Sequence, residues 1–205
     1  MSSNRLPRKM LQNIGDMKLV DHVFNNLSEA ENITDVVIAT SKNDSDDELV
    51  NYCQRRNIEC FRGNLDDVAS RFLQISQDKK ASAFVRISGD SPLIDPTLID
   101  QLVVEFQNEN ADLITNVQVR SFPKGQSVEV LNSRTFREAY KNFDTNSHFE
   151  HVTQYFYENS SSFRIKNIES HGNYRDINLS VDTDEDLARL KQLIQHNIPI
   201  AEAGS

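Results

Sequence analysis

The chain has 205 residues, with 31 acidic against 22 basic side chains and a formal net charge of -9. This balance excludes a nucleic acid as the main partner, because phosphate backbones are bound by basic surfaces. At this length one domain is expected, with a core large enough to fold without a disulfide or a structural metal.

Two further features indicate in which cellular compartment the protein is found. Cys53 and Cys60 fit no metal-binding or redox spacing, so we expect two reduced cysteines that pack as small apolar residues. No apolar run approaches the roughly 18 residues that a membrane span needs. The sequence therefore predicts a cytoplasmic protein that does not contact a membrane.

The N-terminal segment Met1–Lys9 places Arg5, Arg8 and Lys9 among hydroxyl and amide side chains. Such a segment can bind phosphates, although it lacks the glycines of a Walker loop. A solvated basic tail is the other interpretation, and both stay open at this point.

Strands and helices are then predicted in alternation. Helices are predicted after the Gly15–Asp16 turn, with an apolar face from Leu19 to Leu27, at 46–56, from Asp66 or Asp67 through at least Ile75, and at 96–108. The predicted strands cover 35–40, 58–61, 83–87 and 111–116. Alternation at this spacing is typical of βαβ units, which wind into a parallel sheet covered by helices on both faces. The fold class that follows is α/β.

Asp90 is the first candidate for a residue of a binding or active site. It follows the apolar run 83–87 through Ser88 and Gly89, so it is expected at the carboxyl edge of the sheet, where ligands bind in open α/β proteins. Asp95 and Pro96 then begin a helix, as its N-cap and its first residue. A carboxylate beside a glycine at this edge suits a divalent cation carrying phosphates. The alternative is an aspartate that only caps a turn.

The pattern is less regular after residue 120. A half-exposed strand is predicted at 127–131, two short helices at 134–140 and 147–157, and a strand with one solvent face at 163–168. A last strand is predicted at 178–181, followed by a helix from Asp182 to about His196 with acidic residues in its first turn.

Six segments carry a recognisable combination of motifs: Ser3–Lys9 (SNRLPRK), Phe61–Val68 (FRGNLDDV) with Arg71, Arg86–Pro96 (RISGDSPLIDP), Gly125–Val130 (GQSVEV), Glu150–Thr153 (EHVT) and Val181–Leu187 (VDTDEDL). In this order and spacing they resemble the sugar-acid cytidylyltransferases of the acylneuraminate/KDO type, most closely the spore-coat polysaccharide type. The resemblance runs from Ser2 to about Leu193.

The resemblance implies a Rossmann-like, doubly wound, mostly parallel sheet of the nucleotide-diphospho-sugar transferase type. It implies one nucleotidyltransferase domain over residues 1–205, with 120–170 as an inserted, β-containing arm that makes a homodimer and binds the sugar. The implied reaction converts CTP and a sugar acid to a CMP-sugar and pyrophosphate, for surface polysaccharide biosynthesis.

The resemblance also implies roles for individual residues. Lys9, Arg5 and Asp90 would be catalytic, and Asp90 and Asp182 would hold Mg²⁺. The implied nucleotide-binding residues are Ser3, Arg5, Lys9, Gly63, Asp67, Arg71, Ser88 and Gly89. The implied substrate-binding residues are Gln126, Glu129 and His151. Displacement at the α-phosphorus needs cations and a metal rather than a protein nucleophile, which agrees with this set of side chains.

Each role has a structural alternative. Asp182 could cap the last helix, and Arg71 could form a surface ion pair with Asp66 and Asp67. Glu129 alternates with two valines and could lie on the solvent face of a strand. His148 and His151 lie three residues apart without an evident third metal ligand, so a solvated or substrate-facing pair is the other interpretation.

The sequence departs from the family at its beginning. Members open with an apolar, central strand that leads into the basic loop, and here Met1 stands where that strand should have ended. We therefore expect the two neighbouring strands to lack hydrogen-bond partners. Three interpretations stay open: a start further upstream, a truncated product, and a catalytically inactive nucleotide-binding paralogue. An acceptor that is a sugar phosphate or polyol phosphate is a further alternative, for which Arg120, Lys124 and Lys166 could supply a basic patch.

Overall fold

The computed structural model of the chain describes residues 6 and 8–195. Its α-helices are α1 (Leu19–Glu29), α2 (Asp47–Arg55), α3 (Val68–Asp78), α4 (Pro96–Asn108), α5 (Ser133–Tyr140), α6 (Asn146–Glu150), α7 (Gln154–Glu158) and α8 (Asp184–Gln195). The strands are β1 (Asn13–Ile14), β2 (Met17–Lys18), β3 (Ile38–Ser41), β4 (Cys60–Gly63), β5 (Ala83–Arg86), β6 (Leu113–Thr115), β7 (Glu129–Asn132) and β8 (Ile165–Asn167). Three short 3₁₀ helices are η1 (Lys9–Leu11), η2 (Asp44–Asp46) and η3 (Ser160–Ser162).

The largest sheet has four strands in the order β5-β7-β6-β8. β7 runs antiparallel to both of its neighbours, and β8 runs parallel to β6. β5, β6 and β8 therefore point the same way, but two of the three ladders in this sheet are antiparallel, so it is a mixed sheet rather than the mostly parallel one that was predicted. β3 and β4 form a separate parallel pair, and β1 and β2 form a short antiparallel hairpin.

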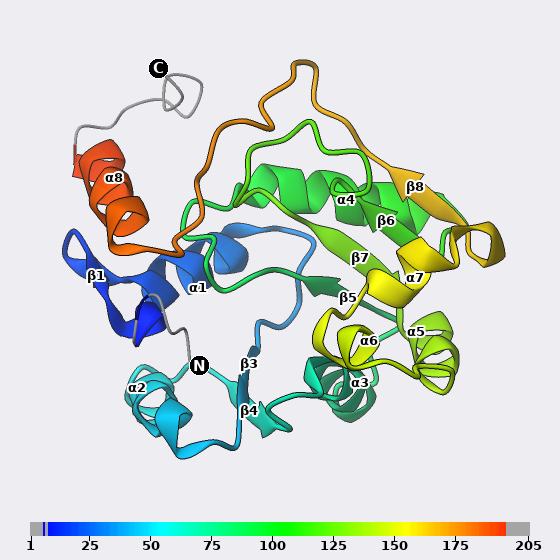
Figure 1. The fold of residues 1–205 in the computed structure, drawn as a ribbon, viewed down its shortest axis with the longest axis horizontal. Coiled ribbons are helices and arrows are strands. Elements are labelled where there is room, and N and C mark those ends of the chain that lie inside the picture. Colours follow the sequence, from blue (N-terminus) through cyan, green and yellow to red (C-terminus); the bar gives the residue numbers. More distant parts are fainter. Residues whose placement is uncertain (1–5, 7, 196–205) are drawn as a thin grey trace.

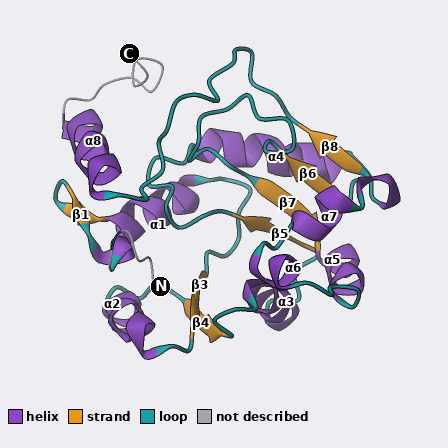
Figure 2. Ribbon diagram, viewed as in Figure 1, coloured by secondary structure: helices purple, strands orange, loops and turns teal. Residues whose placement is uncertain are grey.

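Helices cover both faces of the four-stranded sheet (Figures 1 and 2). On one face, the side chains of Val85, Ile114 and Val130 join an apolar cluster with α4. On the other face, Phe84, Leu113 and Leu131 pack with residues of α3, α5, α6 and α7. A third cluster forms where η1, α1, α2 and α8 meet. The predicted α/β class, with helices on both faces, is confirmed.

The described residues form no single continuous sheet, which agrees with the expectation that two strands would lack a hydrogen-bond partner. β3 pairs only with β4, and β5 pairs only with β7, so no ladder joins the two sheets. The residues of β5 are all partly exposed, whereas Leu113, Ile114 and Thr115 of β6 are fully buried. β5 therefore has the exposure of an edge strand, although its sequence is that of an interior strand.

Three local predictions are also corrected. Residues 127–131 were expected to be half exposed, but Glu129, Val130 and Leu131 are buried, because β7 lies between β5 and β6 with helices above and below. The helix expected at 147–157 is two helices, α6 and α7, which are separated by residues 151–153.

The strand expected at 178–181 is an extended segment with a single bridge, between Lys124 and Asn178. The Asn178 side chain accepts hydrogen bonds from the backbone N–H and the hydroxyl of Ser180, and local bonds of this kind compete with a ladder.

Two helix starts form as their sequences predict. Asp95 caps α4 by accepting a hydrogen bond from the Thr97 backbone N–H, with Pro96 in the first turn. Asp67 caps α3 through the backbone N–H of Ser70. In the described part of the chain, no helix is long and apolar enough to cross a membrane.

Candidate active site

The side chains of Lys9, Asp90 and Asp182 meet at one point of the fold. The Lys9 Nζ atom lies 3.1 Å from Oδ1 of Asp182 and 3.5 Å from Oδ2 of Asp90. Only 9% of the Lys9 side chain is exposed, against 24% and 22% for the two aspartates. The structure thus brings together three of the residues that the sequence singled out, from three distant segments.

Backbone contacts hold these three segments in place. The Val181 backbone N–H donates to the Asp90 carbonyl oxygen at 2.9 Å, which aligns the segment before Asp182 with the loop after β5. Met10 packs against Gly89 so closely that a Cβ there would lie 3.1 Å from the methionine methyl group. Gly89 thus allows the segment carrying Lys9 to approach Asp90.

A second lysine completes the cluster. The Lys124 Nζ atom lies 3.1 Å from Oδ2 of Asp182. The following residue, Gly125, has a φ of +94°, and a Cβ there would lie 2.7 Å from the backbone of Leu179. A glycine is therefore required where the Lys124 segment crosses the Asp182 segment. The sequence suggested Lys124 only as part of a possible basic patch.

Asp182 is not the cap of α8. Thr183 caps the helix instead: its hydroxyl accepts from the Asp186 backbone N–H, and Oδ2 of Asp186 accepts from the backbone N–H groups of Asp182 and Thr183. The Asp182 carboxylate is left to face the two lysines. Burial opposes its charge, but the hydrogen bonds from Lys124 and Lys9 outweigh burial and hold its pKa below the ordinary value of 3.8.

This donor set fits a divalent cation. Two carboxylates that face one ammonium group can face a metal ion in the same space, and carboxylate oxygens are suitable ligands for Mg²⁺. Among the described residues no group of three or more His, Cys, Asp or Glu side chains converges on a metal position. A cation held here would take its remaining ligands from water and phosphate, which is how Mg²⁺ is commonly bound.

Arg71 lies under the loop that joins β4 to α3, rather than in a surface ion pair. Its guanidinium donates to the carbonyl oxygens of Asn64 and Leu65, both at 2.7 Å. The side chain is buried, and desolvation lowers the pKa of the guanidinium despite nearby Asp67 and Asp66. A Cβ on Gly63 would lie 2.7 Å from Cγ of Arg71, so the glycine makes room for this side chain. Both residues shape the loop.

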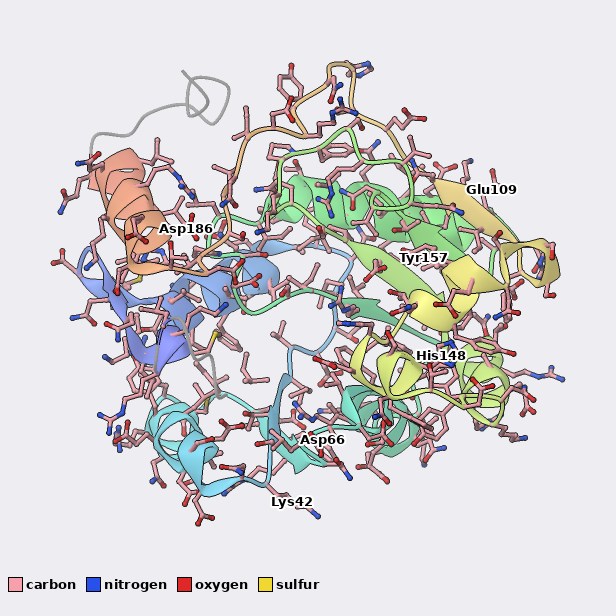
Figure 3. All side chains as sticks on the ribbon, in the orientation of Figure 1. Lys42, Asp66, Glu109, His148, Tyr157 and Asp186 are labelled. Atoms are coloured by element: carbon pink, nitrogen blue, oxygen red, sulfur yellow. The ribbon has the colours of Figure 1, made fainter. Side chains whose placement is uncertain are left out.

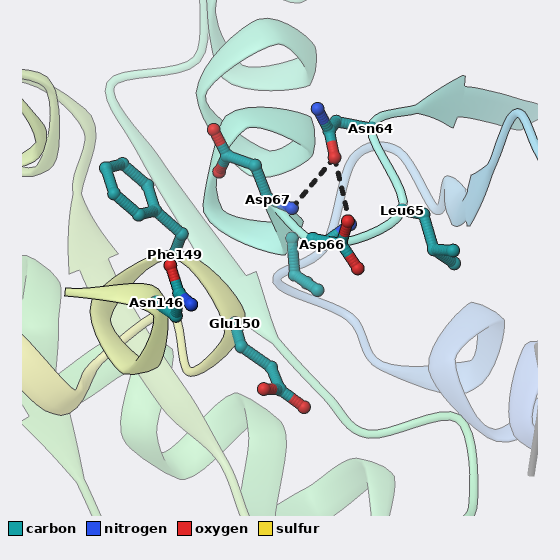
Figure 4. Close-up of a pocket in the computed structure, with 8 residues that line it drawn as sticks. Asn64, Leu65, Asp66, Asp67, Asn146, Phe149 and Glu150 are labelled. Atoms are coloured by element: carbon teal, nitrogen blue, oxygen red, sulfur yellow. Dashed lines mark hydrogen bonds between the residues drawn. The ribbon is translucent and has the colours of Figure 1, made fainter.

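The same loop borders a cavity of about 620 Å³. Its lining comes from residues 64–68 and from Asn146, Phe149 and Glu150 of α6 (Figure 4). Asp67 lies in this wall, where one carboxylate oxygen caps α3 and the other accepts from the Tyr140 hydroxyl at 2.5 Å. In Figure 3, Asp66 of this loop is well separated from Asp186, next to the Lys9 cluster. The cavity and the Lys9 cluster are therefore distinct parts of the surface.

The predicted substrate-binding residues differ in accessibility. The Gln126 amide is buried and joins the Asp95 backbone N–H to the Leu93 carbonyl, so it holds the loop after Asp90. Glu129 is 1% exposed and contacts Arg86 and Tyr157. His151 is exposed at the end of α6. Of these three side chains, only His151 is open to solvent.

Ser88 is partly exposed in the loop beside Gly89. Ser3 and Arg5 lie outside the described residues. Sequence reasoning missed Tyr140 and Tyr157 altogether, since nothing local marks a tyrosine whose partner is 28 or 73 residues away. Arg86 could have been recognised as a candidate site residue, because strand alternation puts it on the same face as Phe84 and it comes just before the Ser88–Asp90 turn.

The fold and this cluster define an α/β nucleotidyltransferase. A cytidylyltransferase from Leptospira borgpetersenii superposes with a TM-score of 0.92 at 25% identity, over 98% of this chain and 85% of that one. A CMP:2-keto-3-deoxy-manno-octonic acid synthetase in complex with CTP superposes with a TM-score of 0.72 at 14% identity, over 96% and 95% of the two chains.

The family model for cytidylyltransferases matches residues 1–204, and the chain belongs to this family of enzymes. It is 30% identical to an uncharacterized protein of Methanocaldococcus jannaschii, over 95% of this chain and 79% of that protein. It is 28% identical to the spore coat polysaccharide biosynthesis protein SpsF of Bacillus subtilis, over 95% and 83%. A 3-deoxy-manno-octulosonate cytidylyltransferase of Koribacter versatilis is 26% identical over 68% of this chain and 54% of that enzyme. The resemblance inferred from the six motifs is confirmed.

Proposed function

We propose that the chain transfers CMP from CTP to a sugar acid and releases pyrophosphate, with Mg²⁺ held by Asp90 and Asp182. The observation that carries the proposal is the Lys9 ammonium between these two carboxylates. An ammonium and two carboxylates at the carboxyl end of β5 supply charges of both signs where a metal and a triphosphate would bind together.

In the reaction, a hydroxyl oxygen of the acceptor bonds to the α-phosphorus of CTP while the bond to the pyrophosphate oxygen breaks, and the hydroxyl proton is released to solvent. Mg²⁺, when bound, supplies positive charge against the phosphate oxygens. Lys9 turns from the aspartates to the phosphates, where it acts as a point charge. Lys124 continues to neutralise Asp182, and Gln126 keeps the loop after Asp90 in place. No side chain need form a covalent intermediate.

The nucleotide is expected to extend from the Lys9 cluster towards the loop that Arg71 holds. In this proposal, Gly63 and Arg71 act indirectly by fixing the backbone of residues 64 and 65, which can then face the base or the ribose. Asp67 fixes the start of α3 and its contact with Tyr140. Ser3 and Arg5 would complete the phosphate site, together with Ser88 and Gly89.

The names of the relatives support an acidic sugar as acceptor. One is a 3-deoxy-manno-octulosonate cytidylyltransferase, and SpsF is named for spore coat polysaccharide biosynthesis. Surface polysaccharide biosynthesis is thus the proposed process. A homodimer formed through residues 120–170, with His151 facing the sugar or the partner subunit, is part of the same proposal.

The described structure gives less support to a phosphorylated acceptor. Its recognition would need a basic patch from Arg120, Lys124 and Lys166. Lys166 instead pairs with Glu105 and Glu109, and Lys124 pairs with Asp182. Arg120 donates to Ser127. The three cations do not form one patch.

Pyrophosphate release from CTP tests the proposal, with Mg²⁺ and 3-deoxy-manno-octulosonate as the first acceptor tried. Asp90→Asn and Asp182→Asn should each reduce turnover at least 100-fold, the scale expected when a group that stabilises transition-state charge is removed. Asp176→Asn is the matched control, because that side chain is 95% exposed and should be dispensable. A folded protein that binds CTP without turning over any sugar acid would instead be a nucleotide-binding protein.

A further inference from the structure

A row of polar side chains crosses the four-stranded sheet at one end. The register places Arg86 of β5 opposite Glu129 of β7, Glu129 opposite Thr115 of β6, and Thr115 beside Asn167 of β8. Two residues earlier in β5, the corresponding row begins with Phe84 and Leu131 and is apolar. The polar row therefore marks the carboxyl end of β5. Here the side chains on this face change from apolar core residues to polar residues near the candidate site.

Three members of this row are already bonded to other groups of the protein. Glu129 is 1% exposed, and its two carboxylate oxygens accept from Arg86 and from the Tyr157 hydroxyl. The Tyr157 hydroxyl also lies 2.9 Å from the Thr115 hydroxyl. Burial and the neighbouring Glu129 raise the pKa of Tyr157, so it stays a protonated donor. The side chain of Asn167 is bonded to the backbone of Val119.

Arg86 is the member that still faces outwards. One guanidinium nitrogen, Nη1, donates to Oε2 of Glu129 at 2.7 Å, and 30% of the side chain is exposed. Within residues 6 and 8–195, the structure records no partner for its other two nitrogens. Among the described residues, no strand pairs with the other edge of β5. Arg86 therefore presents unused donors in a fixed orientation.

The position of Arg86 relative to Asp90 suits the acceptor. Four residues of extended chain at about 3.3 Å each span at most about 13 Å, so the Cα atoms of Arg86 and Asp90 lie no further apart than that. Lys9 already occupies the space between Asp90 and Asp182, where the phosphates would bind. An anion beside Arg86 would lie next to the phosphates rather than among them. This suits the carboxylate of a 2-keto sugar acid, which is bonded to the carbon that carries the reacting hydroxyl and so lies close to the α-phosphorus in the reaction.

We propose that Arg86 binds the carboxylate of the sugar-acid acceptor, and that Glu129 and Tyr157 are positioning residues that orient its guanidinium. This inference rests on the proposed function and assigns the recognition of the acid to one side chain. A guanidinium matches a carboxylate through two parallel hydrogen bonds, which a lysine cannot reproduce. Glu129 acts on the substrate only through Arg86, since its own oxygens are occupied.

Steady-state kinetics with Arg86→Gln and Arg86→Lys tests the assignment. Both variants should raise the KM for 3-deoxy-manno-octulosonate about 10- to 100-fold, the loss expected for hydrogen bonds to a charged group, while the KM for CTP changes less than about twofold. The carboxamide of the same sugar should react poorly with the unchanged protein, and Arg86→Gln should remove this discrimination. Arg137→Gln, on the exposed side of α5, is the matched control.

The positioning residues need a separate readout. Tyr157→Phe and Glu129→Gln should raise the KM for the acid by smaller factors and leave the KM for CTP unchanged. Introducing Arg86→Lys into the Glu129→Gln variant should raise the KM for the acid little further, because the two residues act as one unit. A loss of thermal stability with unchanged kinetic constants would show that the row is only structural and would overturn the proposal.

Direct binding separates this inference from the proposed function. 3-Deoxy-manno-octulosonate alone should raise the Tm of the unchanged protein and should not raise that of Arg86→Gln. A protein that shows this difference but releases no pyrophosphate would disprove the proposed function and keep the carboxylate site. If Arg86→Gln weakened CTP binding and left binding of the acid unchanged, the guanidinium would serve the nucleotide instead.

Discussion

The ammonium nitrogen of Lys9 lies 3.1 Å from Oδ1 of Asp182, although 173 residues separate them in the chain. This contact joins the first described helix turn, η1, to the segment that enters α8. The same nitrogen lies 3.5 Å from Asp90. The cluster thus combines one residue from each end of the described chain with one from its middle.

Lys9→Gln should separate binding of the phosphates from folding. The variant loses a cation that would face the triphosphate, so we expect turnover to fall about 100- to 1000-fold. Asp90 and Asp182 would also lose the ammonium that lies between them, and Mg²⁺ alone should then raise the Tm more than it does in the unchanged protein. Calorimetry with and without Mg²⁺ checks this. An equal shift in both proteins would show that the metal does not bind at these carboxylates.

Gly125→Ala should be costly because two effects combine. The φ of +94° is unfavourable for alanine, and its Cβ would lie 2.7 Å from the Leu179 backbone. We expect a loss of about 2–4 kcal/mol in the free energy of unfolding, and lower turnover because Lys124 and Asp182 move apart. Denaturant unfolding measures the first effect.

Gly15→Ala is the matched control for this steric contact. It also has a left-handed φ, of +62°, but nothing lies within 4 Å of its added Cβ. Its cost should stay near 1 kcal/mol, from backbone strain alone. Equal costs at the two positions would mean that the approach of Leu179 contributes nothing.

Gln126→Leu tests whether this amide is structural. The side chain is 4% exposed and joins the Asp95 N–H to the Leu93 carbonyl. Leucine would leave both backbone groups unpaired, so we expect a loss of about 2–4 kcal/mol in the free energy of unfolding. Among molecules that remain folded, the KM for the acceptor should be nearly unchanged. A raised KM for the acceptor at unchanged stability would show that Gln126 binds the substrate.

The predictions from sequence succeeded best where one residue has one local role. The start of α4 followed from Asp95 and Pro96, and the position of Asp90 followed from an apolar run that gives way to Ser88 and Gly89. Lys9 and Asp182 were singled out by resemblance, because no local signal brings together residues so far apart. Their alternative roles, as a tail residue and a helix cap, were equally consistent with the sequence.

The remaining errors come from contacts that depend on the tertiary fold. The alternation around Glu129 was correct for a strand, but only the order of strands shows that β7 is interior and that Glu129 faces Arg86. For Arg71 the sequence left a surface ion pair open as the alternative to a nucleotide-binding role, and only the fold shows that the side chain is buried under its own loop. The segment 178–181 is extended and buried from Leu179 onwards, but in the described structure its backbone bonds go to Lys124 and Asp90, which belong to loops rather than strands.

Acid should destabilise the protein partly through Asp112. This carboxylate is 9% exposed and accepts from Arg164 and Thr135. Burial opposes its charge, but these bonds outweigh burial and lower its pKa from 3.8. A folded-state pKa below the unfolded value stabilises the fold above about pH 4, and this stabilisation is lost as the pH falls through the folded value.

Asp112→Asn should therefore cost about 1–3 kcal/mol at pH 7 and less at pH 3. Denaturant unfolding at both pH values measures the difference, with Asp176→Asn as the exposed control. A cost that is the same at both pH values would mean that the charge of Asp112 contributes no stability.

The most direct test of the central claim is the CTP-induced change in Tm, measured with and without Mg²⁺ in the unchanged protein and in Asp182→Asn. If Lys9, Asp90 and Asp182 form the nucleotidyl-transfer site, CTP with Mg²⁺ should raise the Tm of the unchanged protein by several degrees. Removal of Mg²⁺ or of the Asp182 charge should remove most of that rise. An equal rise in Asp182→Asn, or a rise that does not depend on Mg²⁺, would contradict the assignment of the metal and triphosphate to this cluster.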